Sequence, residues 1–339
     1  MVRSDWDPYI VEKIKTQHRD DPDGFFICCA SFEERSVGAA RRLSTSYLCQ
    51  RTAIFIYDSP EQQDDRLRSF GELREVLHPL TMDRLDVIPC DRANVFDGLA
   101  KFREVLRQLE KRTCDITFTL DITTFTKLYL LELLYLLTVE QGVTNIRILY
   151  TLPSAYGAGR LSSGVTDVIT MPHMSGFLPI SGNVLMMAFL GFEGERALAI
   201  FERYDPRLTI ALISDPEFRS GYKARVEKEN SFLLSRPGVK IESASPYNPM
   251  TALGKLESLY TDFIGDSKPS SQGVVLVPLG THMQAVSTFL FWRKHRQAQV
   301  IYAFPSGYGI SYKQRKPAQT LSIDLGPVLS AQIIKEKNL

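Results

Sequence analysis

The segment Ile148-Leu-Tyr-Thr-Leu-Pro-Ser-Ala-Tyr-Gly157 recurs near the end of the chain as Val300-Ile-Tyr-Ala-Phe-Pro-Ser-Gly-Tyr-Gly309. In both copies an apolar run leads into the pattern Tyr-x-apolar-Pro-Ser-x-Tyr-Gly, which fixes five residues over eight positions. Similarity between distant parts of one chain is the signature of a repeated structural unit. We therefore predict an internal duplication.

Other pairs of similar segments recur at nearly the same interval. Phe26–Glu33 resembles Leu185–Glu193, and each is followed by an arginine-bearing stretch. Phe55–Asp58 resembles Leu212–Asp215. The alternative is two generic α/β halves whose periodic patterns align without a common origin.

Each half alternates short apolar runs with stretches of helical period, such as Phe96–Glu110 and Thr126–Gln141. Near-continuous apolar strands separated by helices are typical of a parallel sheet that is covered on both faces. The predicted strands are Phe25–Cys29, Thr52–Tyr57, Ile116–Leu120, Ile146–Thr151 and Thr166–Met171, then Val184–Leu190, Leu208–Ser214, Val274–Pro278, Val300–Phe304 and Thr320–Leu325.

The predicted fold is α/β, with two tandem Rossmann-like units, each a mostly parallel sheet flanked by helices. A stretch rich in Gly, Ser and Pro lies near the middle of the chain. We place the first unit at residues 1–173, a linker at 174–182 and the second unit at 183–339.

The composition is that of an ordinary globular protein: 44% of the 339 residues are hydrophobic and 23% are charged, which excludes disorder as the dominant state. Forty basic and 39 acidic residues give a net charge of +1, which argues against a long nucleic acid as the partner but leaves room for a small phosphate-bearing ligand. The N-terminus is charged and no apolar run is long enough to span a bilayer, so we expect a cytoplasmic protein without a membrane partner. The five cysteines form no CxxC pair, and we predict neither a metal site nor a cofactor.

Ligands of open α/β sheets bind beyond the carboxyl ends of the strands, so the strand-to-helix junctions are the places to search for a site. After the first predicted strand, Ser31, Glu33 and Arg35 offer a hydroxyl, a carboxylate and a guanidinium. The equivalent junction of the second half contains Gly191 and Glu193. The alternative is ordinary helix capping, in which Ser31 is the N-cap and Glu34 its capping-box partner.

A second junction follows the strand that ends near Leu120. It carries Asp121, Thr123, Thr124, Thr126 and Lys127, whose hydroxyls, ammonium group and adjacent helix start form a candidate phosphate cradle. A lysine in the first turn opposes the helix dipole, and a bound anion would account for it. The alternative is that Asp121 or Thr123 only caps the helix.

The counterpart of this junction in the second half contains Gly280, Thr281 and His282. Gly280 allows close approach of the backbone, and the other two residues supply polar groups. Tyr156 and Tyr308 of the repeated turns are candidates for stacking on a base or contacting a partner. The alternative for the tyrosines is a rigid Pro-Gly turn at the edge of a sheet.

The run Asp121-Ile-Thr-Thr-Phe-Thr-Lys127 after a strand is similar to the strand-end motif of CARF domains, D/N-Φ-T-G-G-T-K. CARF domains are Rossmann-like sensors of cyclic oligonucleotides in CRISPR-linked defence and normally act as dimers, and the SAVED family resembles two CARF units in one chain. The resemblance implies that Thr123, Thr126 and Lys127 contact ligand phosphate or ribose, with Gly280 and Thr281 doing so in the other half. The sequence departs from the motif where Thr124 and Phe125 replace the two glycines, and Gln284 stands where the second copy would have lysine.

Three functional hypotheses follow. In the first, the chain senses a small anionic ligand, a nucleotide-derived second messenger held between the halves, and signals to a separate effector or assembly protein, because the repeats leave no room for a catalytic domain. In the second, it is a ring nuclease or a nucleoside-processing hydrolase or transferase, with Glu33, Lys127 and His282 as candidate catalytic residues. In the third, it is a structural platform of a defence complex. A homodimer, which would bring four repeats together, is compatible with each.

Overall fold

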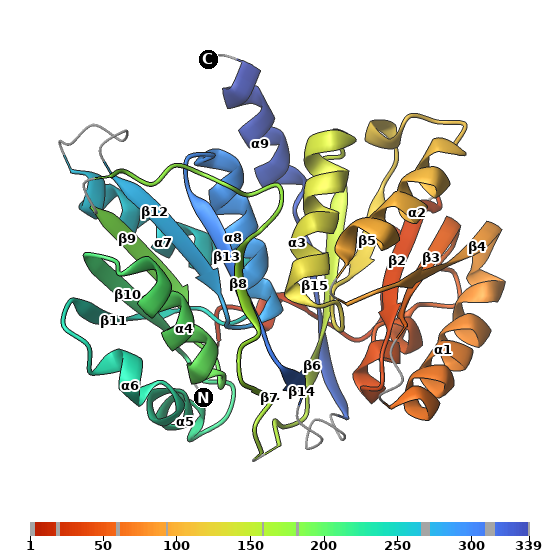
Figure 1. Ribbon diagram of the computed structural model, residues 1–339. Helices are drawn as coiled ribbons and strands as arrows, with labels where there is room; N and C mark the ends of the chain where they lie inside the picture. Colours follow the sequence, from red (N-terminus) through yellow and green to blue (C-terminus); the bar gives the residue numbers. More distant parts are fainter. Residues whose placement is uncertain are drawn as a thin grey trace. The chain divides into compact units, whose positions relative to one another are not determined.

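The computed structural model describes residues 4–17, 21–58, 62–92, 94–157, 159–180, 183–265, 272–308 and 316–337. It confirms the α/β class: the chain forms two compact units, each built on a mostly parallel sheet with helices (Figure 1). The first unit comprises Asp7–Gly157 and Lys313–Leu339, and the second comprises Ala158–Tyr312 and Met1–Trp6.

The sheet of the first unit has the strand order β1-β15-β6-β5-β2-β3-β4. Strands β2 to β6 pair in parallel, whereas β15 and β1 are antiparallel to their neighbours. The bounds are β1 Ile10–Val11, β2 Asp23–Ala30, β3 Cys49–Tyr57, β4 Thr81–Cys90, β5 Phe118–Asp121, β6 Ile146–Pro153 and β15 Pro317–Asp324.

The helices of the first unit are α1 Gln63–Leu77, α2 Val95–Arg107, α3 Lys127–Tyr135 and α9 Gly326–Lys337. Helix α2 buries Val95, Leu99, Phe102 and Leu106, a spacing that places one apolar stripe against the sheet. Helix α3 is apolar and buried nearly all round, and it ends in a single π-helical turn at Leu136–Glu140.

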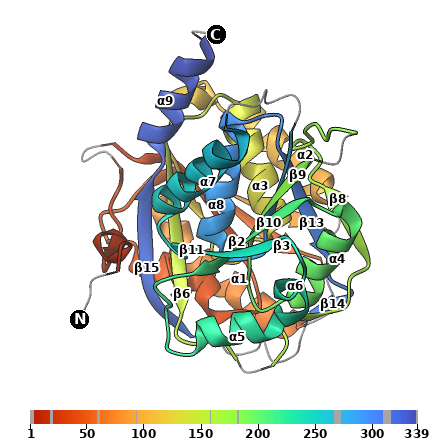
Figure 2. The same cartoon turned by 90° about the vertical axis from the view of Figure 1, so that its left-hand side faces the viewer.

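The sheet of the second unit has the order β11-β10-β9-β12-β13-β8, in which only β8 is antiparallel to its neighbour. Helices α7 and α8 lie side by side (Figure 2). The bounds are β8 Asp167–Thr170, β9 Val184–Phe189, β10 Leu208–Ser214, β11 Val239–Ala244, β12 Gly273–Pro278 and β13 Gln299–Phe304, with α4 Gly194–Tyr204, α5 Tyr222–Glu229, α6 Ser231–Leu234, α7 Pro249–Ile264 and α8 His282–Lys294.

Apart from the two-residue edge strand β1 of the first unit, both sheets share one topology. Numbered along the chain within each unit, the parallel strands run third, second, first, fourth, fifth, and an antiparallel strand follows the fifth. The strand order is the one that the predicted duplication requires, although the duplication itself stays a prediction. In each sheet the order reverses between the first and fourth strands, β2 and β5 or β9 and β12, so these pairs mark the topological switch points.

The unit boundaries differ from the predicted ones because the final strands are exchanged. Strand β8 follows β6 in the chain but pairs with β13 of the second unit, and β15 follows β13 but pairs with β6 of the first. Residues 158–173 therefore belong to the second unit, as do the described residues of the predicted linker 174–182, and the C-terminal segment returns to the first. A short ribbon of β7 Ser162–Ser163 and β14 Gly307–Tyr308 lies in the second unit.

Besides the two-residue strands β1, β7 and β14, the structure has two longer strands that the apolar runs did not reveal, β4 and β11. Each is the edge strand next to the second strand of its unit, and much of each is exposed. An edge strand with one face in water carries charged residues and no continuous apolar run, which is why the sequence pattern missed both.

Two glycine substitutions test the packing of the second unit. A Cβ on Gly194 would lie 1.8 Å from the carbonyl oxygen of Glu229, so Gly194→Ala must displace backbone, and we expect it to lower the free energy of unfolding by about 1–3 kcal/mol. Gly254 lies inside α7 with nothing within 4 Å of such a Cβ, so Gly254→Ala should raise that free energy by about 0.5–1 kcal/mol. Urea unfolding of both variants is the measurement, and a Gly194→Ala variant as stable as the parent chain would contradict the close α4–α5 contact.

Candidate functional site

The predicted junctions of the first unit meet at its switch point. The loop after β2 and the loop after β5 follow neighbouring parallel strands. The Thr124 hydroxyl joins them by donating to the Cys29 carbonyl over 2.7 Å. The candidate residues after β2 and those after β5 therefore lie together at the carboxyl edge of the sheet of the first unit.

Glu33 and Arg35 form a buried ion pair at this edge. Their exposed fractions are 5% and 2%, and Arg35 Nε donates to Glu33 Oε2 over 2.5 Å. Arg35 also donates to the Thr151 carbonyl of β6 over 3.4 Å, and its guanidinium lies 5.8 Å from the centre of the Tyr150 ring. The arginine thus ties the loop after β2 to the fifth strand of the sheet.

The helix-capping alternative for this loop is not what the structure shows. The residues after Glu33 form a short 3-10 helix, Glu34–Val37, whose N-cap position makes no side-chain capping bond. The Ser31 hydroxyl instead accepts a hydrogen bond from the Glu33 amide. The residue types at this junction are therefore explained by the ion pair rather than by a capping box.

The second unit repeats the ion pair at its own carboxyl edge. Glu193 accepts a 2.9 Å hydrogen bond from Arg196, whose Nε donates to the Ala303 carbonyl of β13 over 2.8 Å. The Arg196 guanidinium lies 4.9 Å from the centre of the Tyr302 ring. Tyr302-Ala303 and Tyr150-Thr151 occupy the same places in the two repeated segments, so the two arginines make the same three contacts.

Asp121, the last residue of β5, has a buried carboxyl group at the carboxyl edge of the first unit. Burial raises the pKa of Asp121 to about 7, although hydrogen bonds from the Thr123 hydroxyl and amide and the nearby charge of Arg35 lower it. The Thr123 hydroxyl also accepts from the Thr151 amide over 2.9 Å. Asp121 and Thr123 therefore connect β5 to β6 and do not cap the helix.

Helices α3 and α8 begin in the same way. Thr126 is the N-cap of α3 and Lys127 its first residue, whereas Thr281 is the N-cap of α8 and His282 its first residue. Alignment on the caps places His282, not Gln284, opposite Lys127, because the loop after β12 is two residues shorter. Lys127 and His282 are both half-buried.

The third residue of each helix ties it to the loop after the third strand. Tyr129 donates to the Asp91 carbonyl over 2.7 Å in the first unit, and Gln284 donates to the Ser245 carbonyl over 3.1 Å in the second. Gln284 also accepts from the Thr281 amide over 2.9 Å and completes a capping box. A Cβ on Gly280 would lie 1.9 Å from the Gln284 side-chain oxygen, so the glycine makes room for this capping side chain.

The remaining predicted site residues are one glycine and two tyrosines. Gly191 brings the ends of β9 and β12 together, because a Cβ there would lie 2.6 Å from the Leu279 carbonyl oxygen. Tyr156 is half-buried, and burial followed by the nearby Tyr156 hydroxyl raises the pKa of Tyr150. The backbone of Tyr308 pairs with Ser162, but its side chain lies outside the described residues.

Four further residues lie at the carboxyl edge of the first unit and were not predicted from the sequence. Phe32, Tyr57, Arg66 and Arg92 come from the loop after β2, the end of β3, helix α1 and the loop after β4. The Arg92 guanidinium lies 5.3 Å from the centre of the Tyr57 ring and 5.9 Å from that of Phe32. The signal that would have found Arg92 is its place two residues beyond β4, a strand that was itself missed.

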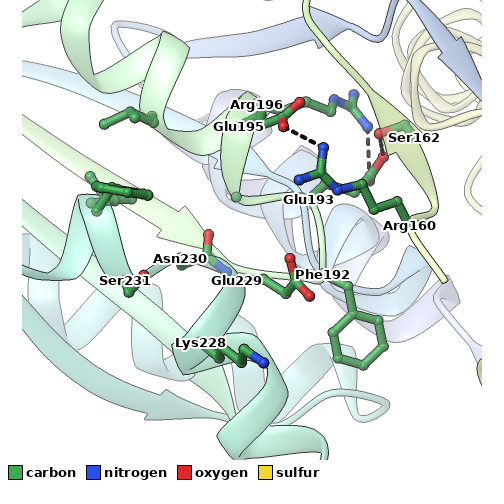
Figure 3. A pocket seen from close by; sticks show the side chains of 14 residues that line it. Arg160, Ser162, Phe192, Glu193, Glu195, Arg196, Lys228, Glu229, Asn230 and Ser231 are labelled. Carbon is green, nitrogen blue, oxygen red and sulfur yellow. Dashed lines mark hydrogen bonds and ion pairs between the residues drawn. The ribbon is translucent and has the colours of Figure 1, made fainter. Parts of the chain in front are cut away.

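A pocket of about 210 Å³ lies in the second unit between the start of α4 and the α5–α6 segment (Figure 3). Of the predicted residues, Glu193 lines it, and its carboxylate also accepts from the Ser162 hydroxyl. The charged lining residues are balanced in sign: Arg160, Arg196 and Lys228 against Glu193, Glu195 and Glu229. The lining therefore does not select for an anion.

Within the described parts of the chain, no group of His, Cys, Asp and Glu side chains is arranged to hold a metal ion. No helix among them is both long and apolar enough to cross a membrane.

The buried ion pair predicts a large effect of a single truncation. Arg35→Ala leaves the Glu33 carboxylate buried without its counter-charge, so the free energy of unfolding should fall by about 3–5 kcal/mol. The control is Arg112→Ala, which removes an exposed arginine paired with Asp115 and should leave that free energy unchanged. Urea unfolding compares them, and removal of both charges in Glu33→Gln/Arg35→Met should restore part of the loss. Equal effects of the two single variants would contradict the burial of the pair.

The raised pKa of Asp121 predicts a dependence of stability on pH. Because the folded state favours the protonated acid, its contribution to stability is complete below about pH 4 and is lost as the pH rises through about 7. At 1.36 kcal/mol per pKa unit, this contribution is up to about 4 kcal/mol. Subtracting the pH profile of Asp121→Asn from that of the parent chain isolates it, and superimposable profiles would exclude a raised pKa.

No family model matches the chain, and no curated protein matches it. Among solved structures, it is similar to the cytoplasmic domain of a prokaryotic cation chloride cotransporter, with a TM-score of 0.27 and 10% identity over 86% of this chain and 99% of that one. It is also similar to the N-domain of a bacterial malonyl-CoA reductase in complex with NADP, with a TM-score of 0.22 and 11% identity over 81% of this chain and 80% of that one. Likenesses this distant carry no argument about function.

Proposed function

We propose that the protein binds a nucleotide-derived second messenger of the cyclic oligonucleotide class and signals to a separate effector in a prokaryotic antiviral defence system, within the cytoplasm. One observation carries the proposal. At the switch point of the first unit, a loop fixed by the buried Glu33–Arg35 pair lies beside a threonine-capped helix that opens with Lys127.

The start of α3 is suited to an anion for two reasons. The first amides of a helix have no partner within the helix, and the aligned peptide dipoles place partial positive charge at this end. Lys127 adds a full positive charge where the dipole disfavours one, and a phosphate group would reverse that penalty. A net charge of +1 for the chain fits a small anion better than a polyanion, whose binding relies on many basic residues.

Aromatic side chains at the same edge support a ligand that carries bases. Phe32 in the loop after β2 and Tyr156 beyond β6 are both half-buried, so part of each ring remains accessible. Stacking of a base on such a ring typically contributes about 1–3 kcal/mol and does not depend on the identity of the base. The resemblance of Asp121–Lys127 to the CARF strand-end motif supports the cyclic class.

A second candidate function is cleavage of the same ligand. Lys127 at the start of α3 is placed to stabilise negative charge that develops on a phosphate during cleavage. Glu33 is less suited to act as a nucleophile or base, because it is buried and paired with Arg35.

Titration of the full chain with cyclic di-, tri-, tetra- and hexanucleotides and their linear forms tests the proposal. We expect at least one cyclic member to raise the melting temperature. Lys127→Ala should weaken its binding by about tenfold to a hundredfold, the range for loss of one hydrogen bond to a charged group. The control is Lys111→Ala, which removes an exposed lysine that precedes β5 and therefore lies toward the opposite edge of the sheet.

Absence of a shift with every member of the panel, or equal weakening by the two lysine variants, would refute the proposal. Chromatography of the recovered ligand separates the two candidate functions. An intact ring supports sensing alone, whereas a linear product formed by the parent chain but not by Lys127→Ala establishes cleavage.

A further inference from the structure

Three consecutive strand ends of the first unit bring an arginine against two aromatic rings. Phe32 follows β2, Tyr57 ends β3, and Arg92 follows β4. The Arg92 guanidinium lies within 6 Å of both ring centres, at 5.9 Å from Phe32 and 5.3 Å from Tyr57. Rings that flank a guanidinium hold its plane in a fixed orientation, which suits it to bind the oxygens of a phosphate.

A second guanidinium lies close enough to Arg92 for the two charges to repel each other. Arg66 of α1 is 4% exposed. Burial, followed by the positive charge of Arg92, lowers the pKa of Arg66, and the Asp58 carboxylate and the Cys29 thiol act in the opposite direction. Arg66 therefore adds to the positive charge around Arg92, and the Asp58 carboxylate offsets part of it.

Tyr57 connects this arginine pair to the helix start. Its hydroxyl accepts a 2.9 Å hydrogen bond from the Thr126 amide, the N-cap of α3. Tyr57 therefore contacts the Arg92 guanidinium through its ring, and through its hydroxyl it contacts the backbone of the residue before Lys127. Arg66, Arg92 and Lys127 form a cationic group that we call the arginine edge.

Among the described residues of the second unit, the equivalent place holds no such cationic group. Phe192 corresponds to Phe32, and its ring carries Arg225, which donates to the Gly159 carbonyl over 2.8 Å. In the first unit, Arg92 follows Asp91, whose carbonyl accepts the hydrogen bond from α3. In the second unit, Pro246 stands in the same place, because it follows Ser245, whose carbonyl accepts the bond from α8. The Pro246 carbonyl accepts from the hydroxyl of Thr281.

The chain's own N-terminal segment adds a negative charge at that edge. The Ser245 hydroxyl donates to the Asp5 carboxylate over 3.0 Å, and the Asn248 amide donates to the Asp5 carbonyl over 3.0 Å. The Trp6 ring packs edge-on against Tyr247, with centres 5.1 Å apart. An anionic ligand at the second edge would meet this carboxylate.

We propose that the arginine edge of the first unit is the phosphate-binding site of the chain and that the second unit binds no phosphate at the equivalent place. The ligand group is a phosphodiester or terminal phosphate, and Phe32 provides a ring on which an attached base stacks. The inference rests on the proposed function only for the identity of the ligand, because the arginine edge itself requires only an anion.

Isothermal titration of the full chain with inorganic tripolyphosphate tests the site without knowledge of the messenger. We expect one site per chain, with binding weakened at least tenfold by Arg92→Gln. Arg225→Gln is the matched control, since it removes the ring-stacked arginine of the second unit and should leave the affinity unchanged. Thermal unfolding without the anion checks that both variants fold, and Arg92→Lys, which keeps the charge but loses the planar fork, should fall between the parent chain and Arg92→Gln.

Two sites per chain, equal weakening by the two glutamine variants, or no binding by the parent chain would overturn the inference. These outcomes are separate from failure of the proposed function. If tripolyphosphate binds at one Arg92-dependent site but no cyclic oligonucleotide binds, the proposed function fails and the arginine edge stands. If an oligonucleotide binds with an affinity that Arg92→Gln leaves unchanged, the reverse holds.

Discussion

A buried arginine in each unit ties the loop after the first strand to the fifth strand, and the shape of the carboxyl edge depends on this contact. In the first unit, β5 is only four residues long, so Arg35 reaches across its end to the carbonyl of Thr151. Glu33 neutralises the arginine, and the Tyr150 ring lies against its guanidinium. Because loss of one partner of a buried pair typically costs about 3–5 kcal/mol, the loop has little freedom to leave this position.

The same contacts recur in the second unit. Comparison of the two units therefore distinguishes the residues that hold the carboxyl edge together from those that differ between the units. Residues that both units share, namely the Glu–Arg pair, the tyrosine under the guanidinium and the threonine cap, are those that hold the edge together. Residues that differ, Arg92 against Pro246 and Lys127 against His282, lie beside that framework, and we propose that they decide what the edge binds. The same framework thus presents cationic side chains at the carboxyl edge of the first unit. At the equivalent edge of the second unit, the loop after β11 is bonded to Asp5 and Thr281 instead.

The sequence predicted the parallel strands with near-continuous apolar runs because both of their faces are buried, as in β2 and β6. It also predicted the switch-point junctions, since polar residues directly after such runs are easily recognised. It missed β4 because this edge strand carries three acidic or basic residues near its middle that interrupt any apolar run, and with β4 it missed Arg92. The sequence could not predict that β8 pairs within the second unit and β15 within the first, because antiparallel pairing with a distant strand leaves no local pattern.

We propose that the carboxyl edge of the first unit, and not that of the second, binds the anionic ligand. Hydrogen–deuterium exchange of the full chain with and without saturating tripolyphosphate tests it most directly, because it reports on both edges in one experiment. The account predicts slower amide exchange in the Cys29–Phe32 and Thr126–Tyr129 segments and no change in Ser245–Asn248 or Thr281–Gln284. Protection of the second pair of segments, or of neither pair, would contradict it.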